Sequence, residues 1–152
     1  PYLSLFLFLL DTGVRLGEAL NFKKDAIQRL DGKYFIVLYA DETKNNTTRS
    51  VPLTRRCVAI VNAIGDFSHL DYNMTERVWK RLRQDMGLDG DKQFVIHCLR
   101  HTCASRLAQS GKVELHFIKE WLGHKSYNMT LRYAHLMPKN LLKAVSILED
   151  YE

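Results

Sequence analysis

The chain has 152 residues, of which 46% are hydrophobic and 26% are charged. Those fractions are typical of a globular domain and exclude a disordered tail, a collagen-like repeat and a coiled coil. Its 22 lysines and arginines exceed its 17 aspartates and glutamates, and the formal charge of +5 favours an anionic partner. A chain of this length is expected to form one domain, and no linker-like segment divides it.

The positive charge is concentrated in the second half of the chain. Residues 1–76 carry nine basic and nine acidic side chains, whereas residues 77–152 carry thirteen basic and eight acidic ones. The three cysteines cannot all pair within the chain, which favours a reduced, cytoplasmic protein. The apolar run over residues 2–10 is about half as long as a membrane helix, so no membrane partner is expected. Because the chain opens with Pro1 directly before this run, we interpret it as a fragment of a longer protein.

The first half predicts two helices and a small sheet. The helices are expected over residues 3–10 and 15–22, and the strands over 26–30, 34–39 and 49–53. Thr12-Gly13 separates the two helices. Asp31-Gly32 stands between two runs of strand formers, which is the strongest short hairpin signal, and a second turn over 43–48 leads to the third strand. Two tight turns imply that all three strands are antiparallel.

The second half is predicted to be helical. Helices are expected over residues 54–64, from 73 onward, and over 99–109, 113–122, 126–134 and 138–148. Thr54 is placed to cap the first of these, and Gly65 and Gly123 follow helices as C-terminal stops. Asn73, with Glu76 three residues later, resembles a capping box. The predicted fold class is therefore mainly α with a small three-stranded antiparallel sheet, an α+β arrangement.

Five short segments carry the side chains that attack on a phosphodiester requires. They are TGVRLGE (12–18), TKNNTTRSVPL (43–53), HCLRH (97–101), LGH (122–124) and LRYAH (131–135). Two arginines can hold the non-bridging phosphate oxygens with forked, charge-assisted bonds, and rigid donors of this kind are usually the largest catalytic contribution. A lysine can protonate the leaving alkoxide. A tyrosine nucleophile has a free pKa of about 10 and therefore needs a base, which a histidine can supply.

The order of these residues resembles the catalytic domain of the tyrosine recombinases, the phage integrase family. The matching residues are, in chain order, Arg15, Lys44, His97, Arg100, His124 and Tyr133. They stand in TGxRxxE, in a turn between two strands, in HxxR, in LGH and in RYAH, and His124 precedes Tyr133 by nine residues, as in the family. The resemblance runs from Thr12 to about Leu148 and implies the fold of the DNA breaking-rejoining enzymes.

The resemblance implies a site-specific DNA recombinase of the integrase type that works through a covalent intermediate. Tyr133 would attack the scissile phosphate, form a 3′-phosphotyrosyl bond and free a 5′-hydroxyl. His97 would serve as general acid and base for the tyrosine, and Lys44 would protonate the leaving oxygen. No metal, cofactor or ATP is implied, because arginines take the place of a metal and the adduct conserves the bond energy.

The remaining family positions are interpreted as groups that bind the phosphate or brace the site. Arg15 and Arg100 would hold the non-bridging oxygens, and His124 would hydrogen-bond the phosphate. Glu18 and His101 are interpreted as structural support. Taken singly, either arginine is more often a surface or ion-paired residue, and it is the shared motif context that favours the functional interpretation.

Basic side chains on the helix expected from residue 73 onward are candidates for DNA contacts. Arg77, Lys80 and Arg81 share one face of that helix with Gln84. A solvated surface would have the same pattern. The charge excess and the family resemblance together favour contacts to the DNA backbone.

The resemblance also implies partners and missing parts. The expected partner is double-stranded DNA, with a tetramer on DNA for the full-length protein and a monomer for the fragment. Family members usually carry an N-terminal core-binding domain, and integrases often add an arm-binding domain, and we expect both to be missing here. A bacterial or phage-encoded cytoplasmic protein is implied. Residues 139–148 match a segment that often docks onto a neighbouring protomer.

Several alternatives stay open at the level of the sequence. Lys33 is the fallback for Lys44, and Tyr127 lies six residues before Tyr133. Two histidines four residues apart on one helix, with two cysteines nearby, could bind zinc. A type IB topoisomerase-like strand transferase, or a non-catalytic DNA-binding module, would use much of the same residue set.

Overall fold

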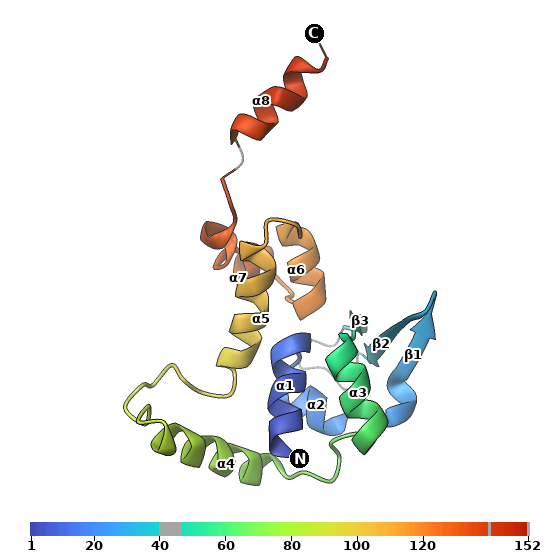
Figure 1. The fold of residues 1–152 in the computed structure, drawn as a ribbon, viewed down its shortest axis with the longest axis vertical. Coiled ribbons are helices and arrows are strands. Elements are labelled where there is room, and N and C mark those ends of the chain that lie inside the picture. Colours follow the sequence, from blue (N-terminus) through green and yellow to red (C-terminus); the bar gives the residue numbers. More distant parts are fainter. Residues whose placement is uncertain (40–46, 140, 152) are drawn as a thin grey trace.

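The computed structural model describes residues 1–39, 47–139 and 141–151 (Figure 1). The described helices are α1 (Tyr2–Thr12), α2 (Leu16–Asn21), α3 (Arg55–Ile64), α4 (Tyr72–Asp85), α5 (Cys98–Gln109), α6 (Leu115–Leu122), α7 (Tyr127–Leu131) and α8 (Leu141–Glu149). The strands are β1 (Ile27–Leu30), β2 (Lys33–Leu38) and β3 (Arg49–Pro52). The prediction of a mainly helical fold with one three-stranded antiparallel sheet is confirmed.

Helix α1 joins the two halves of the molecule, because it packs against both α3 and α5 (Figure 1). Its apolar residues recur on nearly every face, so α1 is a core helix rather than an amphipathic surface helix. Phe8 stacks on Phe22 with ring centroids 5.5 Å apart and meets Phe67 edge-on at 5.3 Å. All three rings are almost fully buried, so this aromatic group fixes the first half of the chain around α1.

A second hydrophobic cluster lies between α5 and α6. It contains Ala104 and Ala108 of α5, Ile118 and Leu122 of α6, and the ring of Tyr133. Small alanine side chains on α5 allow the two helices to approach closely. Tyr133 is therefore held by the same packing that joins α5 to α6.

The sheet has the strand order β1-β2-β3, and both pairs are antiparallel. The predicted hairpin is confirmed, because Asp31 and Gly32 have φ values of 49° and 75°, as a two-residue type I′ turn requires. The predicted third strand is also present, and Arg49 pairs with Leu38 at its start. The second predicted turn, over residues 43–48, lies mostly outside the described residues. Since β3 contacts α6, the start of this strand reaches the second half of the chain.

Most helices begin one to three residues away from the predicted positions. Helix α4 begins at Tyr72 rather than at Asn73, because the Asp71 carboxylate caps it by accepting a hydrogen bond from a backbone N–H at 2.8 Å. Helix α6 begins at Leu115, two residues later than predicted. Helix α8 begins at Leu141, three residues later than predicted. The caps predicted at residues 54, 65 and 123 are confirmed.

Helix α7 is shorter than predicted, and this shortening positions the candidate nucleophile. Ser126 caps the helix, which ends at Leu131. The chain then turns, with the N–H of Tyr133 donating to the carbonyl of Thr130 at 3.0 Å, and continues as a 3-10 turn over Ala134–Leu136. Tyr133 therefore lies in a turn, and its side chain enters the cluster between α5 and α6.

Helix α8 extends away from the rest of the molecule (Figure 1). Its side chains Val145, Ile147 and Leu148 are at least half exposed. No described helix is long and apolar enough to cross a membrane. The candidate site is built by elements that precede α8.

Candidate active site

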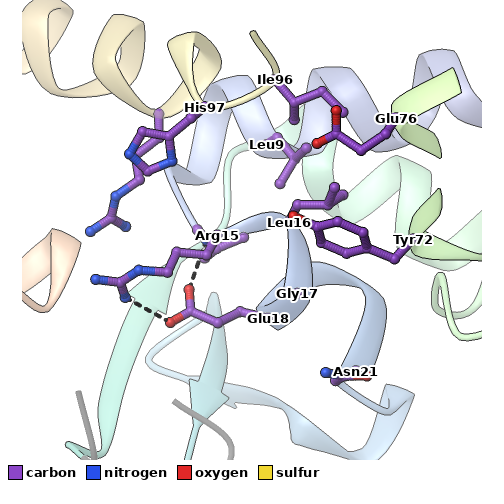
Figure 2. Close-up of a pocket in the computed structure, with 12 residues that line it drawn as sticks. Leu9, Arg15, Leu16, Gly17, Glu18, Asn21, Tyr72, Glu76, Ile96 and His97 are labelled. Atoms are coloured by element: carbon purple, nitrogen blue, oxygen red, sulfur yellow. Dashed lines mark hydrogen bonds and ion pairs between the residues drawn. The ribbon is translucent and has the colours of Figure 1, made fainter. Parts of the chain in front are cut away.

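Predicted site residues from α1–α2 and α5 line one cavity of about 450 Å³. Figure 2 shows His97 above the side chain of Arg15 at one end of this cavity, with Tyr72 and Glu76 at the other end. Arg100 also lines it. The turn between α1 and α2 and the start of α5, more than 80 residues apart in the chain, are thus brought together as the motifs predict.

Arg100 is buried and fixed by two backbone carbonyls. Its Nη1 donates to the carbonyl of Gly13 and its Nη2 to the carbonyl of Leu122, both at 2.6 Å. Burial, together with the charges of Arg15 and Arg49, lowers the pKa of Arg100 to about 10, so the side chain remains a cation at neutral pH. A guanidinium has five N–H donors, so two bonds to the protein leave donors for an anion.

Glu18 connects two arginines. The backbone N–H of Arg15 donates to Glu18 Oε2 at 2.8 Å, and Arg15 Nη1 donates to Oε1 at 3.1 Å. Arg49 makes a forked pair with the same carboxylate, at 2.9 and 2.7 Å. Burial alone raises the pKa of a carboxyl, but the bonds and charge of Arg49, and then of Arg15, lower the pKa of Glu18 below its ordinary value. Glu18, predicted as structural support, thus holds Arg15 and Arg49 beside each other, and its role in the site stays a prediction.

Arg49 is a residue of the site that the sequence analysis did not identify. It stands at the first position of β3, is 9% exposed, and its Nε donates to the carbonyl of Trp121 at 3.3 Å. That carbonyl precedes the Leu122 carbonyl that binds Arg100. The sequence around Arg49 carries no local signal for this role, because an arginine at the start of a short strand is ordinarily exposed.

Steric constraints explain why LGH has a glycine at position 123. Gly123 ends α6 with a φ of +66°, which favours glycine. A Cβ at this position would lie 2.9 Å from Cδ and 3.0 Å from Nε of Arg49. The glycine therefore lets Arg49 pass close to the end of α6.

His124 is 8% exposed and is oriented by α7. Its Nδ1 forms a hydrogen bond of 2.7 Å with Oγ1 of Thr130, which is itself fully buried. Burial and the charges of Arg100 and Arg15 lower the pKa of His124 to about 4. The ring is therefore neutral at pH 7, and a bond from Nδ1 leaves Nε2 as its other hydrogen-bonding atom.

His97 and His101 lie one helical turn apart at the start of α5. Their rings meet edge-on, with centroids 4.9 Å apart. Partial burial, then the neighbouring His101 and Arg100, lower the pKa of His97 to about 4. Partial burial and the charges of Arg132 and Arg100 also lower the pKa of His101. Both imidazoles are thus neutral at pH 7.

Tyr133 is 5% exposed, and its hydroxyl oxygen lies 2.5 Å from Nδ1 of His101. Burial raises the pKa of the Tyr133 phenol, and the positive charge of neighbouring Arg132 offsets only part of that increase. The phenol is therefore protonated at neutral pH. Its hydroxyl contacts His101, whereas the resemblance assigned the tyrosine to His97.

The remaining predicted residues fall into two groups, one outside the described residues and one on the surface. Lys44 lies outside the described residues. Arg77, Lys80 and Arg81 are exposed on α4. The fallback residues, Lys33 at the start of β2 and Tyr127 at the start of α7, are both exposed.

The zinc alternative finds no support in the arrangement of the cysteines. Cys103 is buried, and its Sγ lies 3.7 Å from the carbonyl of Asp11, on the side of α5 that packs on α1. Among residues 1–39, 47–139 and 141–151, no three His, Cys, Asp or Glu side chains are grouped so that they could hold a metal ion. Cys98 and Cys103 are accordingly small apolar residues of the packing.

The described cluster carries more positive than negative charge. It contains three guanidiniums, those of Arg15, Arg49 and Arg100, and the carboxylate of Glu18, which pairs with Arg15 and Arg49 but not with Arg100. Neutral histidines and a protonated phenol stand beside them. Fixed donors around an uncompensated positive charge suit an anion such as a phosphodiester.

Two of the curated relatives are named a recombinase and an integrase. The chain is 32% identical over 137 residues to a shufflon-specific DNA recombinase of Escherichia coli, covering 87% of this chain and 34% of that protein. It is 31% identical over 147 residues to a putative integrase of Pseudomonas phage Pf1, covering 96% of this chain and 42% of that protein. The chain thus spans between a third and a half of the length of these two relatives.

Solved structures share the fold. The XerH site-specific recombinase bound to its difH substrate matches with a TM-score of 0.73 and 25% identity, covering 97% of this chain and 46% of that one. The catalytic domain of bacteriophage HP1 integrase matches with a TM-score of 0.70 and 29% identity, covering 94% of this chain and 79% of that one. The model of the phage integrase family matches residues 1–140. The chain therefore belongs to the phage integrase family and has the fold of a tyrosine recombinase catalytic domain.

Proposed function

We propose that this chain is the catalytic domain of a site-specific DNA recombinase of the integrase type. The observation that carries the proposal is the buried Tyr133 hydroxyl beside a histidine, in a cluster with fixed, partly unneutralised arginines. Two relatives named recombinase and integrase, and a structural neighbour solved with its DNA substrate, support DNA as the partner.

The phosphate-binding step uses groups that the protein already holds in place. Arg15 and Arg100 bind the two non-bridging oxygens of the scissile phosphate, and His124 donates a hydrogen bond from Nε2. Arg100 keeps its bonds to the protein during the reaction, so the donors need little reorganisation as charge develops. Tyr72 and Glu76, at the far end of the cavity, lie beyond the groups assigned to the phosphate.

The covalent step transfers the phosphate to the protein. The oxygen of Tyr133 attacks phosphorus, a histidine of α5 takes the phenolic proton, and the bond to the 5′-oxygen breaks. Lys44, proposed from its place in the sequence, protonates that oxygen. The product is a 3′-phosphotyrosyl bond, which conserves the phosphodiester energy, so rejoining needs no ATP. The arginines supply the positive charge that a metal would otherwise provide.

DNA contacts outside the scissile phosphate are assigned to α4. Arg77, Lys80 and Arg81 are proposed to bind backbone phosphates of double-stranded DNA. A tetramer on DNA is proposed for the protein in its full natural length, because strand exchange joins four DNA arms. A bacterial or phage origin and a cytoplasmic location are part of the same proposal.

The proposal is tested by trapping the covalent intermediate. The protein in its full natural length is incubated with nicked duplexes taken from the DNA that flanks its gene, in EDTA. A band that survives SDS and carries the 3′-phosphate on Tyr133, located by mass spectrometry, is the expected result. Tyr133→Phe should abolish the band and spare DNA binding, whereas Tyr127→Phe, the matched control, should keep both.

Three outcomes contradict parts of the proposal. Absence of a band on DNA that the protein binds indicates a non-catalytic binding module. A band that needs added metal after EDTA contradicts the metal-independent mechanism. Adducts on any duplex, followed by relaxation of supercoils without exchange of partners, indicate a type IB topoisomerase-like activity.

A further inference from the structure

A forked ion pair connects the strand residue Arg49 to Glu18, the carboxylate that also holds Arg15. We propose that Arg49 is a positioning residue for DNA cleavage: it is the counter-ion of Glu18, so this carboxylate orients Arg15 while the positive charge of Arg15 stays available to the scissile phosphate. The inference rests on the proposed function and adds to it a residue to which the family resemblance gave no role.

The Glu18 carboxylate divides its bonds unequally between the two arginines. Arg49 donates to both oxygens, from Nη1 to Oε1 at 2.9 Å and from Nη2 to Oε2 at 2.7 Å. Arg15 donates through its backbone N–H to Oε2 and through Nη1 to Oε1 at 3.1 Å, and Figure 2 shows both of these bonds. The guanidinium of Arg15 is therefore held by one longer bond, whereas the guanidinium of Arg49 makes the shorter, forked pair.

Arg15 and Arg49 also differ in what they can reach. Arg15 lines the cavity of about 450 Å³ together with Glu18 and Arg100, and its side chain is 17% exposed. The Arg49 side chain is 7% exposed and lines a separate groove between β3 and α6. Each of its three nitrogens already donates to the protein, to Glu18 or to the carbonyl of Trp121. Arg49 thus acts on a phosphate in the cavity through Glu18 rather than by contact.

The charges of the pair explain why Glu18 needs a second arginine. Burial raises the pKa of Glu18, but the hydrogen bonds and charge of Arg49, and then those of Arg15, lower it below its ordinary value, so the carboxyl is ionised at neutral pH. An ionised carboxylate paired with Arg15 alone would cancel much of the field of that arginine in the cavity. With Arg49 as its counter-ion, Glu18 orients Arg15 without neutralising it, and fixed positive charge remains for the charge that develops on the phosphate.

The counter-ion is itself fixed by the end of α6. Arg49 Nε donates to the carbonyl of Trp121 at 3.3 Å, and the next carbonyl, that of Leu122, accepts a hydrogen bond from Arg100. Gly123 leaves room for the arginine, because a Cβ there would lie 2.9 Å from Arg49 Cδ. The same helix end therefore holds both Arg49 and Arg100, and neither requires further ordering when DNA binds.

The test varies the charge of the arginine and the charge of the phosphate independently. The protein in its full natural length cleaves the nicked duplex at the linkage located by covalent trapping, which is either a phosphodiester or a neutral methylphosphonate. For Arg49→Met we expect cleavage of the phosphodiester to slow by about 10–10²-fold, less than the about 10²–10³-fold for loss of a donor itself. The methylphosphonate carries one negative charge less, so the ratio of wild-type to variant rate should be smaller on that substrate.

Two further variants separate charge from packing. Arg49→Met combined with Glu18→Gln removes both charges of the pair, yet the glutamine oxygen can still accept the N–H of Arg15. This double variant should recover most of the lost phosphodiester cleavage, although it lacks every bond that Arg49 makes to the protein. Arg49→Lys keeps the charge without the fork and should lie between the wild type and Arg49→Met. Arg55→Met, which changes an exposed arginine of α3, is the matched control for the loss of one positive charge and should cleave like the wild type.

Each other outcome overturns the proposal. An equal deficit on both substrates, or a folded double variant as slow as Arg49→Met, shows that Arg49 only stabilises the fold. Wild-type cleavage by Arg49→Met removes the need for a counter-ion. If Arg49→Met does not fold, or if the wild type does not cleave the methylphosphonate, the double variant decides: recovered cleavage supports the counter-ion, and slow cleavage contradicts it. Absence of an adduct with the wild-type protein on DNA that it binds contradicts the proposed function itself, not the role of Arg49.

Discussion

Two groups of basic side chains in this molecule differ in their burial and in the groups that they bind. Arg49 and Arg100 are 9% and 4% exposed, and both bind backbone carbonyls or Glu18. The α4 cations, Arg77, Lys80 and Arg81, are exposed and have no ion-pair partner among the described residues. Buried arginines are therefore part of the folded structure before DNA arrives, whereas the α4 cations lie exposed at the surface. Substitutions in the first group should affect stability and chemistry together, and those in the second group only DNA binding.

Arg100→Ala should have the largest effect. It removes a donor from the developing charge and leaves the Gly13 and Leu122 carbonyls without their partners. Adduct formation should fall by about 10²–10³-fold. The free energy of unfolding should fall by about 2–6 kcal/mol, since two buried carbonyls lose their partner and each costs about 1–3 kcal/mol. Urea unfolding and the nicked-duplex assay measure the two effects. Arg100→Lys keeps the charge without the planar fork, so a lysine variant with full activity would contradict the two-bond arrangement.

Arg49→Ala should lower the stability of the fold, and activity should fall because the site is less stable. The change leaves the buried Glu18 carboxylate with Arg15 alone, and breaking a buried pair costs about 3–5 kcal/mol. The double variant Arg49→Met, Glu18→Gln removes the uncompensated charge and should recover part of this stability. Urea unfolding of the single and double variants measures both. A single variant within about 0.5 kcal/mol of the wild type would mean that the pair of Arg49 with Glu18 does not stabilise the fold.

The position of Arg49 could not be predicted from the sequence. Local patterns predicted the helices around residues 3–10 and 99–109, the Asp31-Gly32 hairpin and the Thr54 cap, because each depends on neighbours in the chain. The family motifs predicted that Arg15 and Arg100 meet. The pairing of Arg49 with Glu18, 31 residues away, has no local signal, since a strand arginine is ordinarily exposed.

The contact between His101 and Tyr133 belongs to the same class of long-range information. These residues are 32 positions apart, and HCLRH contains two histidines that a motif alone does not rank. Which of the two histidines contacts Tyr133 depends on where α7 ends. The sequence analysis predicted that end three residues too late. Without that shortening, Tyr133 would lie in a helix and its direction could not be inferred.

The lowered pKa of His124 predicts that stability depends on pH. The folded pKa of His124 is about 4, below the ordinary 6.5. Between these values the unfolded chain binds more protons, so stability is complete above about pH 6.5 and falls as the pH decreases. For one buried histidine the free energy of unfolding should drop by about 2 kcal/mol from pH 7 to pH 5. Urea unfolding across this range tests it, and His124→Asn should give a flatter profile. An equal slope in both proteins would assign the effect to other groups.

The smallest effect on folding should come from the α4 cations. The triple variant Arg77→Ala, Lys80→Ala, Arg81→Ala changes exposed side chains, so the free energy of unfolding should stay within about 0.5 kcal/mol of the wild type. DNA binding should weaken, and the slope of log affinity against log salt should become shallower by about 0.9 for each phosphate that the variant no longer neutralises. Arg55→Ala, an exposed cation on α3, is the matched control and should leave the slope unchanged. If the triple variant keeps the wild-type slope, the α4 face is a solvated surface, and the DNA contacts of this chain lie elsewhere.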